Sequence, residues 1–138
     1  PYKAAVVGLG NIGMGYDYAH YGDDRVLTHA HAFEAHPGFE LVGAVDPDAE
    51  SRRRFTDRYA RGAYGSIAEL FDQEQPEVVA LAIPTALHAP TFHEIVKHKP
   101  RIILCEKPLA GSVLGSEEML VAADRAGIKV MVNYMRRC

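Results

Sequence analysis

A short apolar run followed directly by a glycine-rich turn constrains this chain more than any other segment. Residues 4–7 read Ala-Ala-Val-Val, and residues 8–13 read Gly-Leu-Gly-Asn-Ile-Gly. A buried strand that leads through G-x-G-x-x-G into a helix is typical of sites that bind a dinucleotide. In such a turn Gly8 permits the sharp bend, Gly10 lets the backbone approach a pyrophosphate, and Gly13 lets the helix pack closely against the strand.

The amide groups at the start of the following helix, those of Asn11 and Ile12 among them, are then expected to hold the phosphates. The pattern alone is weak, because a glycine-rich turn between two elements is common and often binds nothing. The rest of the chain has to decide between these two interpretations.

Beyond the turn, helical and strand patterns alternate along the chain. Residues 14–27, from Met14 to Leu27, are polar, aromatic and glycine residues without a helical period, which predicts an inserted loop. We predict helices at 28–36, 48–59, 66–73, 87–99 and 116–126, and strands at 39–45, at Tyr64 and at 78–83, 102–105 and 129–133. Ser66 and Ser116 are predicted to cap the third and fifth of these helices.

The predicted strands are continuous apolar runs, which indicates a sheet covered on both faces. Strands that alternate with helices predict an α/β fold, a Rossmann-type doubly wound parallel sheet of about six strands in the order 3-2-1-4-5-6. A length of 138 residues suits one domain, so residues 1–138 are expected to form a single dinucleotide-binding domain. In such sheets ligands bind beyond the carboxyl ends of the strands.

Charge and hydropathy exclude several classes of protein. Fifteen basic and 18 acidic residues are mixed along the chain and give a formal net charge of -3, so no basic stripe is present for nucleic acid or an anionic membrane. The longest apolar runs hold about seven residues, far fewer than the roughly 20 that span a bilayer. Cys105 and Cys138 lack the spacing of a zinc site or a disulfide framework, so we interpret both as free thiols of a cytoplasmic protein.

Asp46 ends the second predicted strand, where an acid can accept hydrogen bonds from the adenosine ribose and repel a 2′-phosphate. This position favours NAD over NADP. A carboxylate before Pro47 is also a good helix N-cap, and the two roles are compatible. Three arginines follow, and we interpret Arg52, Arg53 and Arg54 as a solvated helix face rather than as a site for a 2′-phosphate.

Lys107 follows the fifth strand and precedes a proline. A lysine that is partly removed from water beside a nicotinamide can hydrogen-bond a substrate hydroxyl and help move its proton as hydride leaves the same carbon. Most lysines at strand ends only solvate the edge of the sheet, so this residue alone leaves both interpretations open.

Five segments taken together resemble one family. They are residues 8–13, Val45-Asp46, Ile83-Pro84-Thr85 with His88, the Cys-Glu-Lys-Pro-Leu-Ala run at 105–110, and Val132-Asn133-Tyr134 with Arg136. This set resembles the N-terminal domain of the glucose-fructose oxidoreductase, inositol dehydrogenase and rhizopine catabolism (Gfo/Idh/MocA) family. The resemblance covers nearly the whole chain, and its most specific mark is the Glu-Lys-Pro element that contains Lys107.

The resemblance implies NAD(P)-dependent hydride transfer between nicotinamide and a sugar, polyol or related hydroxy compound. It makes Lys107 the catalytic lysine near the substrate hydroxyl. It also implies a set of residues that line the cofactor on its nicotinamide side: Ile83, Pro84, Thr85, His88, Glu106 and Asn133. The family further implies a C-terminal domain with much of the substrate pocket and the oligomer interface, so we expect a homo-oligomeric complete protein.

Two departures from the family pattern bear on function. The insertion at 14–27 carries Tyr16, Tyr18, His20 and Tyr21, which we interpret as part of a surface loop, the alternative being a cover over cofactor or substrate. The second departure is the absence of the C-terminal domain. We therefore expect a cofactor domain taken from a longer protein, which binds cofactor and turns over little, with a naturally short protein as the alternative.

Other functions are weighed against this interpretation. The histidines at 20, 29, 31 and 36 match no known ligand spacing, so no metal is expected. A non-catalytic sensor of NAD(P) or of a sugar would keep the same fold, although the intact Lys107 favours an enzyme. A hydrolase or lyase that keeps NAD bound would recycle the hydride within each turnover and form product without net NADH.

Overall fold

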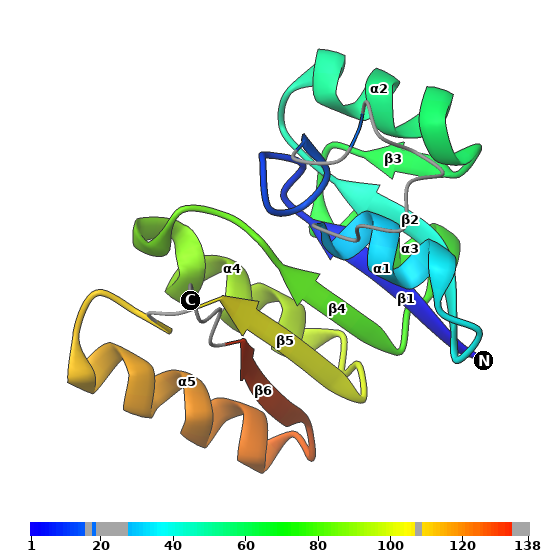
Figure 1. The fold of residues 1–138 in the computed structure, drawn as a ribbon. Helices are drawn as coiled ribbons and strands as arrows, with labels where there is room; N and C mark the ends of the chain where they lie inside the picture. Colours follow the sequence, from blue (N-terminus) through cyan, green and yellow to red (C-terminus); the bar gives the residue numbers. More distant parts are fainter. Residues whose placement is uncertain (16–17, 19–27, 107–108, 134–138) are drawn as a thin grey trace, which may run out of the picture.

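The computed structural model of the chain describes residues 1–15, 18, 28–106 and 109–133. Its strands form one parallel sheet in the order β3-β2-β1-β4-β5-β6 (Figure 1). The strands are β1 (Tyr2–Val7), β2 (Phe39–Val45), β3 (Gly62–Tyr64), β4 (Val78–Leu81), β5 (Ile102–Glu106) and β6 (Lys129–Asn133). The predicted doubly wound sheet and its strand order are confirmed.

Helices cover both faces of the sheet, as the apolar strands predict. They are α1 (His29–Ala35), α2 (Ala49–Tyr59), α3 (Ile67–Glu74), α4 (His88–Lys97) and α5 (Val113–Arg125), and a short 3-10 turn, η2 (Thr85–Leu87), precedes α4. Helices α1 and α2 lie on one face, whereas α3, α4 and α5 lie on the other (Figure 1). Among the described residues, no helix is long and apolar enough to span a bilayer.

Each face of the sheet has its own hydrophobic core, because successive residues of a strand point to opposite sides. On the first face Val6 packs with Phe33 of α1 and Phe55 of α2. On the second face Val79 packs with Phe92 of α4. Phe55 and Phe92 are both fully buried, so the central strands need apolar side chains on both faces of the sheet.

Two glycines allow the close packing of the first crossover. Gly8 has a φ of +100°, and a Cβ atom there would lie 2.4 Å from the carbonyl oxygen of Ala82. A Cβ atom at Gly13 would lie 1.9 Å from the carbonyl oxygen of Gly8. At Gly10, by contrast, a Cβ atom would meet nothing within 4 Å. Packing therefore explains the first and third glycines of the turn and leaves the second unexplained.

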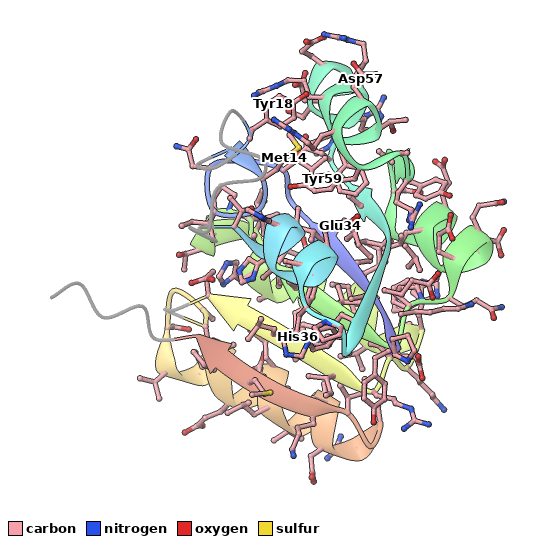
Figure 2. The ribbon with its side chains drawn as sticks, turned by 45° about the vertical axis from the view of Figure 1, so that its right-hand side comes forward. Met14, Tyr18, Glu34, His36, Asp57 and Tyr59 are labelled. Carbon is pink, nitrogen blue, oxygen red and sulfur yellow. The ribbon has the colours of Figure 1, made fainter. Side chains whose placement is uncertain are left out.

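A single helical turn follows the glycines before the insertion begins. The amide groups of Met14 and Gly15 both donate to the carbonyl oxygen of Gly10, each at 2.9 Å. Met14 is fully buried in the same core cluster as Tyr59 of α2 (Figure 2). The first residue predicted for the inserted loop thus belongs to the core, which the sequence did not reveal because a single turn is too short to show a period.

Helix α1 begins next to this turn, on the other side of the insertion. The amide group of His29 donates to the carbonyl oxygen of Ile12 at 3.1 Å, and that of Ala30 donates to Gly13 at 3.0 Å. The Thr28 side chain also caps the helix by accepting from the amide group of His31 at 3.2 Å. The insertion thus interrupts one helical connection, and its two ends meet at the glycine turn.

The last helix begins three residues before the predicted start. Ser112, and not Ser116, is its N-cap, with the hydroxyl accepting from the amide group of Gly115 at 3.0 Å. The sequence hid this start because Val113 and Leu114 are 77% and 65% exposed and show no apolar period. The predicted cap of α3 is confirmed, since the hydroxyl of Ser66 accepts from the amide of the third helical residue at 3.2 Å.

The corrected cap gives a stability prediction. Replacing Ser112→Ala is expected to lower the free energy of unfolding by about 1 kcal/mol, because an amide group at the start of α5 loses its acceptor. Ser116→Ala is the matched control, because this residue lies inside the helix and its hydroxyl donates to the carbonyl oxygen of Ser112 at 3.1 Å without accepting from an amide at the helix start. Urea unfolding of both variants measures the difference. Equal losses in the two variants would contradict the assignment of the cap.

The glycine turn gives a second prediction. Gly8→Ala is expected to lower the free energy of unfolding by at least about 2 kcal/mol, because the new methyl group meets a backbone carbonyl at a positive φ. Gly10→Ala has open space around it, so the change should stay below about 1 kcal/mol. Thermal and urea unfolding of the two variants test this contrast. A large loss in Gly10→Ala would show that the fold itself needs the second glycine.

Candidate functional site

The predicted site residues gather at the carboxyl edge of the sheet. Val7, the last residue of β1, is in register with Val45 on β2 and with Leu81 on β4, so the loops after these strands are neighbours. At the far side, Glu106 on β5 is in register with Asn133 on β6. The predicted catalytic residue, Lys107, lies outside the described residues.

The glycine turn presents backbone amide groups at this edge. The first helical hydrogen bond runs from Met14 to Gly10, so the amide groups of Asn11, Ile12 and Gly13 precede it and have no acceptor within the helix. Such groups are suited to binding phosphate. The open space at Gly10 fits this role, because a ligand that approaches the backbone needs the room that a side chain would occupy.

Asp46 joins the glycine turn to the start of α2. Its Oδ2 atom accepts from the amide group of Leu9 at 2.8 Å, and its Oδ1 atom accepts from that of Asp48 at 2.8 Å. Each carboxylate oxygen has a second lone pair, so the half-buried side chain can still accept from a ligand. Asp46 is not the N-cap of α2: Asp48 is, because its carboxylate accepts from the amide group of Ser51 at 3.0 Å.

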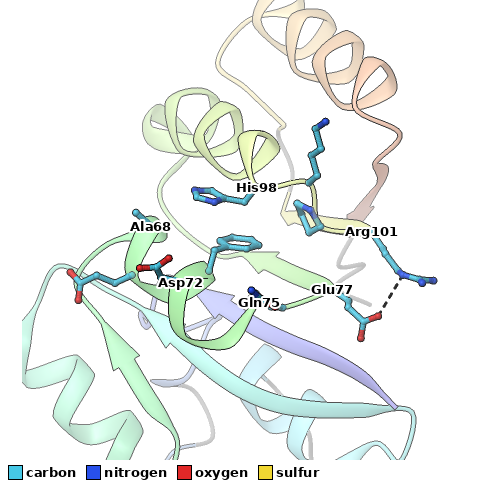
Figure 3. A pocket seen from close by; sticks show the side chains of 11 residues that line it. Ala68, Asp72, Gln75, Glu77, His98 and Arg101 are labelled. Atoms are coloured by element: carbon cyan, nitrogen blue, oxygen red, sulfur yellow. Dashed lines mark ion pairs between the residues drawn. The ribbon is translucent and has the colours of Figure 1, made fainter.

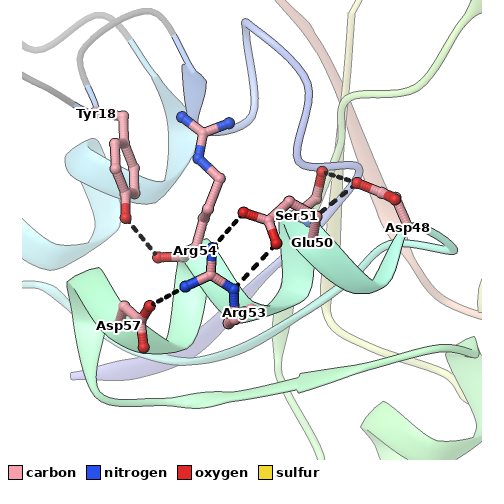
Figure 4. Close-up of polar contacts among 7 residues, drawn as sticks. All are labelled: Tyr18, Asp48, Glu50, Ser51, Arg53, Arg54 and Asp57. Atoms are coloured by element: carbon pink, nitrogen blue, oxygen red, sulfur yellow. Dashed lines mark hydrogen bonds and ion pairs between the residues drawn. The ribbon is translucent and has the colours of Figure 1, made fainter.

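Two arginines near the start of α2, Arg52 and Arg53, are bound within the chain. The Nη1 atom of Arg52 donates to the backbone carbonyl oxygens of Asp46 at 2.8 Å and Pro47 at 2.9 Å. Arg53 pairs with Glu50 and Asp57 (Figure 4). These contacts take up the guanidinium groups nearest to Asp46.

The described part of the insertion contacts α2. The hydroxyl of Tyr18 donates to the backbone carbonyl of Arg54 at 3.1 Å (Figure 4). The guanidinium carbons of Arg54 and Arg58 lie 4.5 and 4.6 Å from the centre of the tyrosine ring, within the range of cation–π attraction. Tyr16, His20 and Tyr21 lie outside the described residues.

The loop after β4 is held by a buried histidine. His88 is 1% exposed, and its Nε2 atom lies 2.7 Å from the carbonyl oxygen of Ile83. Its Nδ1 atom lies 3.0 Å from the carbonyl oxygen of Leu109, two residues beyond Lys107. A neutral imidazole has one N–H, so the neutral ring donates to one of these carbonyls and the protonated ring donates to both. His88 thus links the loop that contains Pro84 to the segment after β5.

The end of β5 carries a contact that sequence reasoning missed. The Nε2 atom of His29, at the start of α1, lies 2.7 Å from the Oε1 atom of Glu106. The two residues are 77 positions apart, and no pattern in the sequence pairs them. Beneath them, burial raises the pKa of Cys105 to about 12, and the Glu106 carboxylate adds to the rise. This thiol is therefore protonated at neutral pH and is a poor nucleophile.

The histidines considered as metal ligands have other contacts in the described part of the chain. His29 pairs with Glu106, and the Nδ1 atom of His36 accepts from the amide group of Gly38 at 2.9 Å. No group of three His, Cys, Asp or Glu side chains in that part is arranged to hold a metal ion.

A pocket of about 720 Å³ lies at the opposite edge of the sheet, before β4 and β5 begin (Figure 3). Phe71 stacks on His98 in its wall, with ring centres 4.6 Å apart, and Arg101 pairs with Glu77 at its rim. Doubly wound sheets bind their ligands at the carboxyl edge, so we do not assign the dinucleotide site to this pocket.

Comparison with known proteins agrees with this geometry. Residues 2–134 match the GFO/IDH/MocA oxidoreductase family, whose domain has an NAD-binding Rossmann fold. The inositol 2-dehydrogenase of Rubrobacter xylanophilus is 32% identical over 102 residues, which are 73% of this chain and 29% of that protein. The NADP⁺-dependent scyllo-inositol 2-dehydrogenase of Bacillus subtilis is 30% identical over 109 residues, 78% of this chain and 32% of that protein.

Two solved structures share the fold of this chain. The WlbA dehydrogenase of Chromobacterium violaceum, solved with NADH and UDP-GlcNAcA, has a TM-score of 0.77 at 26% identity and covers 96% of this chain with 34% of its own. A 3-ketoreductase of Actinomadura kijaniata, solved with TDP-benzene and NADP, has a TM-score of 0.80 at 21% identity. The match covers 97% of this chain and 38% of the 3-ketoreductase chain. The chain therefore spans about a third of these relatives, and it belongs to the Gfo/Idh/MocA oxidoreductase family as an NAD-binding Rossmann domain.

Proposed function

We propose that this chain is the cofactor domain of an enzyme that transfers hydride between nicotinamide and the carbinol carbon of a sugar, polyol or related hydroxy compound. One observation carries the proposal: the second glycine of the turn leaves open space at the carboxyl edge, between the ends of β1, β2 and β4, in a chain of this family. When bound there, the cofactor supplies a carbon that accepts or donates hydride.

The turn and the end of β2 are proposed to hold the adenosine diphosphate half of the cofactor. The amide groups of Asn11, Ile12 and Gly13 would hold the phosphates, with Gly8 and Gly10 shaping the turn. Asp46 would accept hydrogen bonds from the ribose hydroxyls. Its two hydrogen bonds from backbone amides fix the carboxylate for this role.

The preferred cofactor is proposed to be NAD. A 2′-phosphate beside Asp46 would meet a carboxylate, and like charges repel. Arg52 is the cation nearest to that carboxylate in sequence, and it already donates to two backbone carbonyls. A guanidinium group held in this way is a poor partner for an added phosphate. The relative from Bacillus subtilis, which is named for NADP⁺, shows that family membership alone does not decide the cofactor.

The nicotinamide half is proposed to lie between the loop after β4 and the ends of β5 and β6. Its lining would come from Ile83, Pro84, Thr85, Glu106 and Asn133. His88 would act through the loop, because its side chain is buried beneath it and contacts Ile83. Lys107 would then hydrogen-bond the reacting hydroxyl and take or return its proton.

The rest of the protein is proposed from the relatives, which are about three times as long as this chain. A further domain would supply most of the substrate pocket and the interface of a homo-oligomer. A cytoplasmic location also belongs to the proposal, and the free thiol of Cys105 is compatible with a reducing compartment. A non-catalytic sensor and a hydrolase or lyase with bound NAD remain the alternative functions, because fold does not fix chemistry.

The assignment of Asp46 predicts a cofactor preference. Calorimetric titration should give tighter binding of NAD than of NADP, and Asp46→Ala should narrow the ratio of the two dissociation constants by about tenfold, because the repulsion is gone. Asp48→Ala is the control: it removes the cap of α2 two residues away and should leave the ratio unchanged. Equal affinities of the parent for NAD and NADP would refute the assignment.

The assignment of Lys107 predicts a loss of turnover with binding retained. In the complete protein, Lys107→Ala should lower kcat by about 10² to 10⁴ while the dissociation constant of NAD changes less than about threefold. The assay follows the absorbance of NADH with a panel of polyols and sugars as substrates. A variant with parental kcat would contradict the role of the lysine. Product without net NADH would favour the hydrolase or lyase, and no turnover of any panel member would favour the sensor.

A further inference from the structure

The pair formed by His29 and Glu106 connects two distant parts of the carboxyl edge. His29 is the first residue of α1, the helix that follows the glycine turn and leads to β2. Glu106 is the last residue of β5, and β4 lies between β1 and β5 in the sheet. The 2.7 Å contact therefore reaches from the first crossover past one whole strand.

Both partners are shielded from water, which makes the contact more than a surface ion pair. The exposed fraction is 10% for the side chain of His29 and 18% for that of Glu106. A hydrogen bond to a carboxylate is stronger in such surroundings than in water, so its loss is costlier than the loss of a surface contact. The pair therefore restricts where the Glu106 carboxylate can lie.

His29 is itself fixed from the other side. Its backbone amide donates to the carbonyl oxygen of Ile12 in the glycine turn. One residue thus bonds to the proposed diphosphate site through its backbone and to the end of β5 through its side chain. A shift of either part is resisted by the other.

We propose that His29 is a positioning residue, which sets the nicotinamide end of the cofactor site by holding the Glu106 carboxylate. The inference rests on the proposed function, since it assigns the end of β5 to the nicotinamide half. It predicts that His29 matters for binding the nicotinamide part of the cofactor and not for binding the adenosine diphosphate part.

Two ligands distinguish binding of the nicotinamide half of the cofactor from binding of the adenosine diphosphate half. NADH contains both halves, whereas ADP-ribose lacks the nicotinamide. His29→Leu removes the ring nitrogens at similar bulk and should weaken NADH binding by about tenfold, the effect of losing one strong hydrogen bond, while ADP-ribose binding changes by less than about twofold. Fluorescence of the bound nicotinamide should shift in the same variant. His29→Gln keeps a donor and should recover part of the loss.

A double-mutant cycle tests whether His29 acts through Glu106. Glu106→Gln should weaken NADH binding as well, and the double variant His29→Leu/Glu106→Gln should bind no more weakly than the weaker single variant. His31→Leu is the matched control, because His31 lies on the same helix and is 7% exposed, close to the 9% of His29. It should leave the ratio of the NADH and ADP-ribose affinities unchanged.

The outcomes separate this inference from the proposed function. If the parent binds both ligands and His29→Leu leaves NADH binding unchanged, the positioning role is wrong and the proposed function stands. The role is equally wrong if both ligands weaken together, or if the effects of the two single variants multiply. A parent chain that binds neither ligand overturns the cofactor assignment and this inference with it.

Discussion

The close approach of two backbone segments at the first crossover is the constraint on which the rest of the structure depends. Gly8 must take a positive φ against Ala82, and Gly13 must lie against the carbonyl group of Gly8. This contact brings the start of the helical connection close to the end of β1, and it leaves the amide groups of the turn at the carboxyl edge. Because Gly10 is not needed for that packing, the fold leaves one position of the turn open to a ligand.

The acids at this edge have structural partners as well as proposed ligands. Asp46 accepts from two backbone amides, and Glu106 pairs with His29. A carboxylate held by fixed donors loses little further entropy when a ligand binds, which is the advantage of a preorganised site. The bond from Leu9 to Asp46 and the contact of His29 with Glu106 join segments that are far apart in the chain, so they hold the site residues in place and also stabilise the fold.

The sequence predicts the elements whose signals are local. The apolar strands, the glycine turn and the Ser66 cap were all predicted correctly. The strand order also agrees with the prediction from the alternation of strands and helices. The start of α5 was missed because Val113 is exposed and gives no period. The contact of His29 with Glu106 was missed for a different reason, since only the folded sheet brings residues 77 positions apart together.

The insertion is compatible with the contact between His29 and Glu106, because α1 begins at a fixed point after it. Lengthening a loop costs little, about 0.6 kcal/mol for each doubling, so the length of the inserted segment is weakly constrained. Its return point is strongly constrained, because the Thr28 cap and the bond from His29 to Ile12 fix where α1 resumes. The length of the loop is therefore open to change, whereas the first turn of α1 must keep both its backbone bonds and the side chain that contacts Glu106.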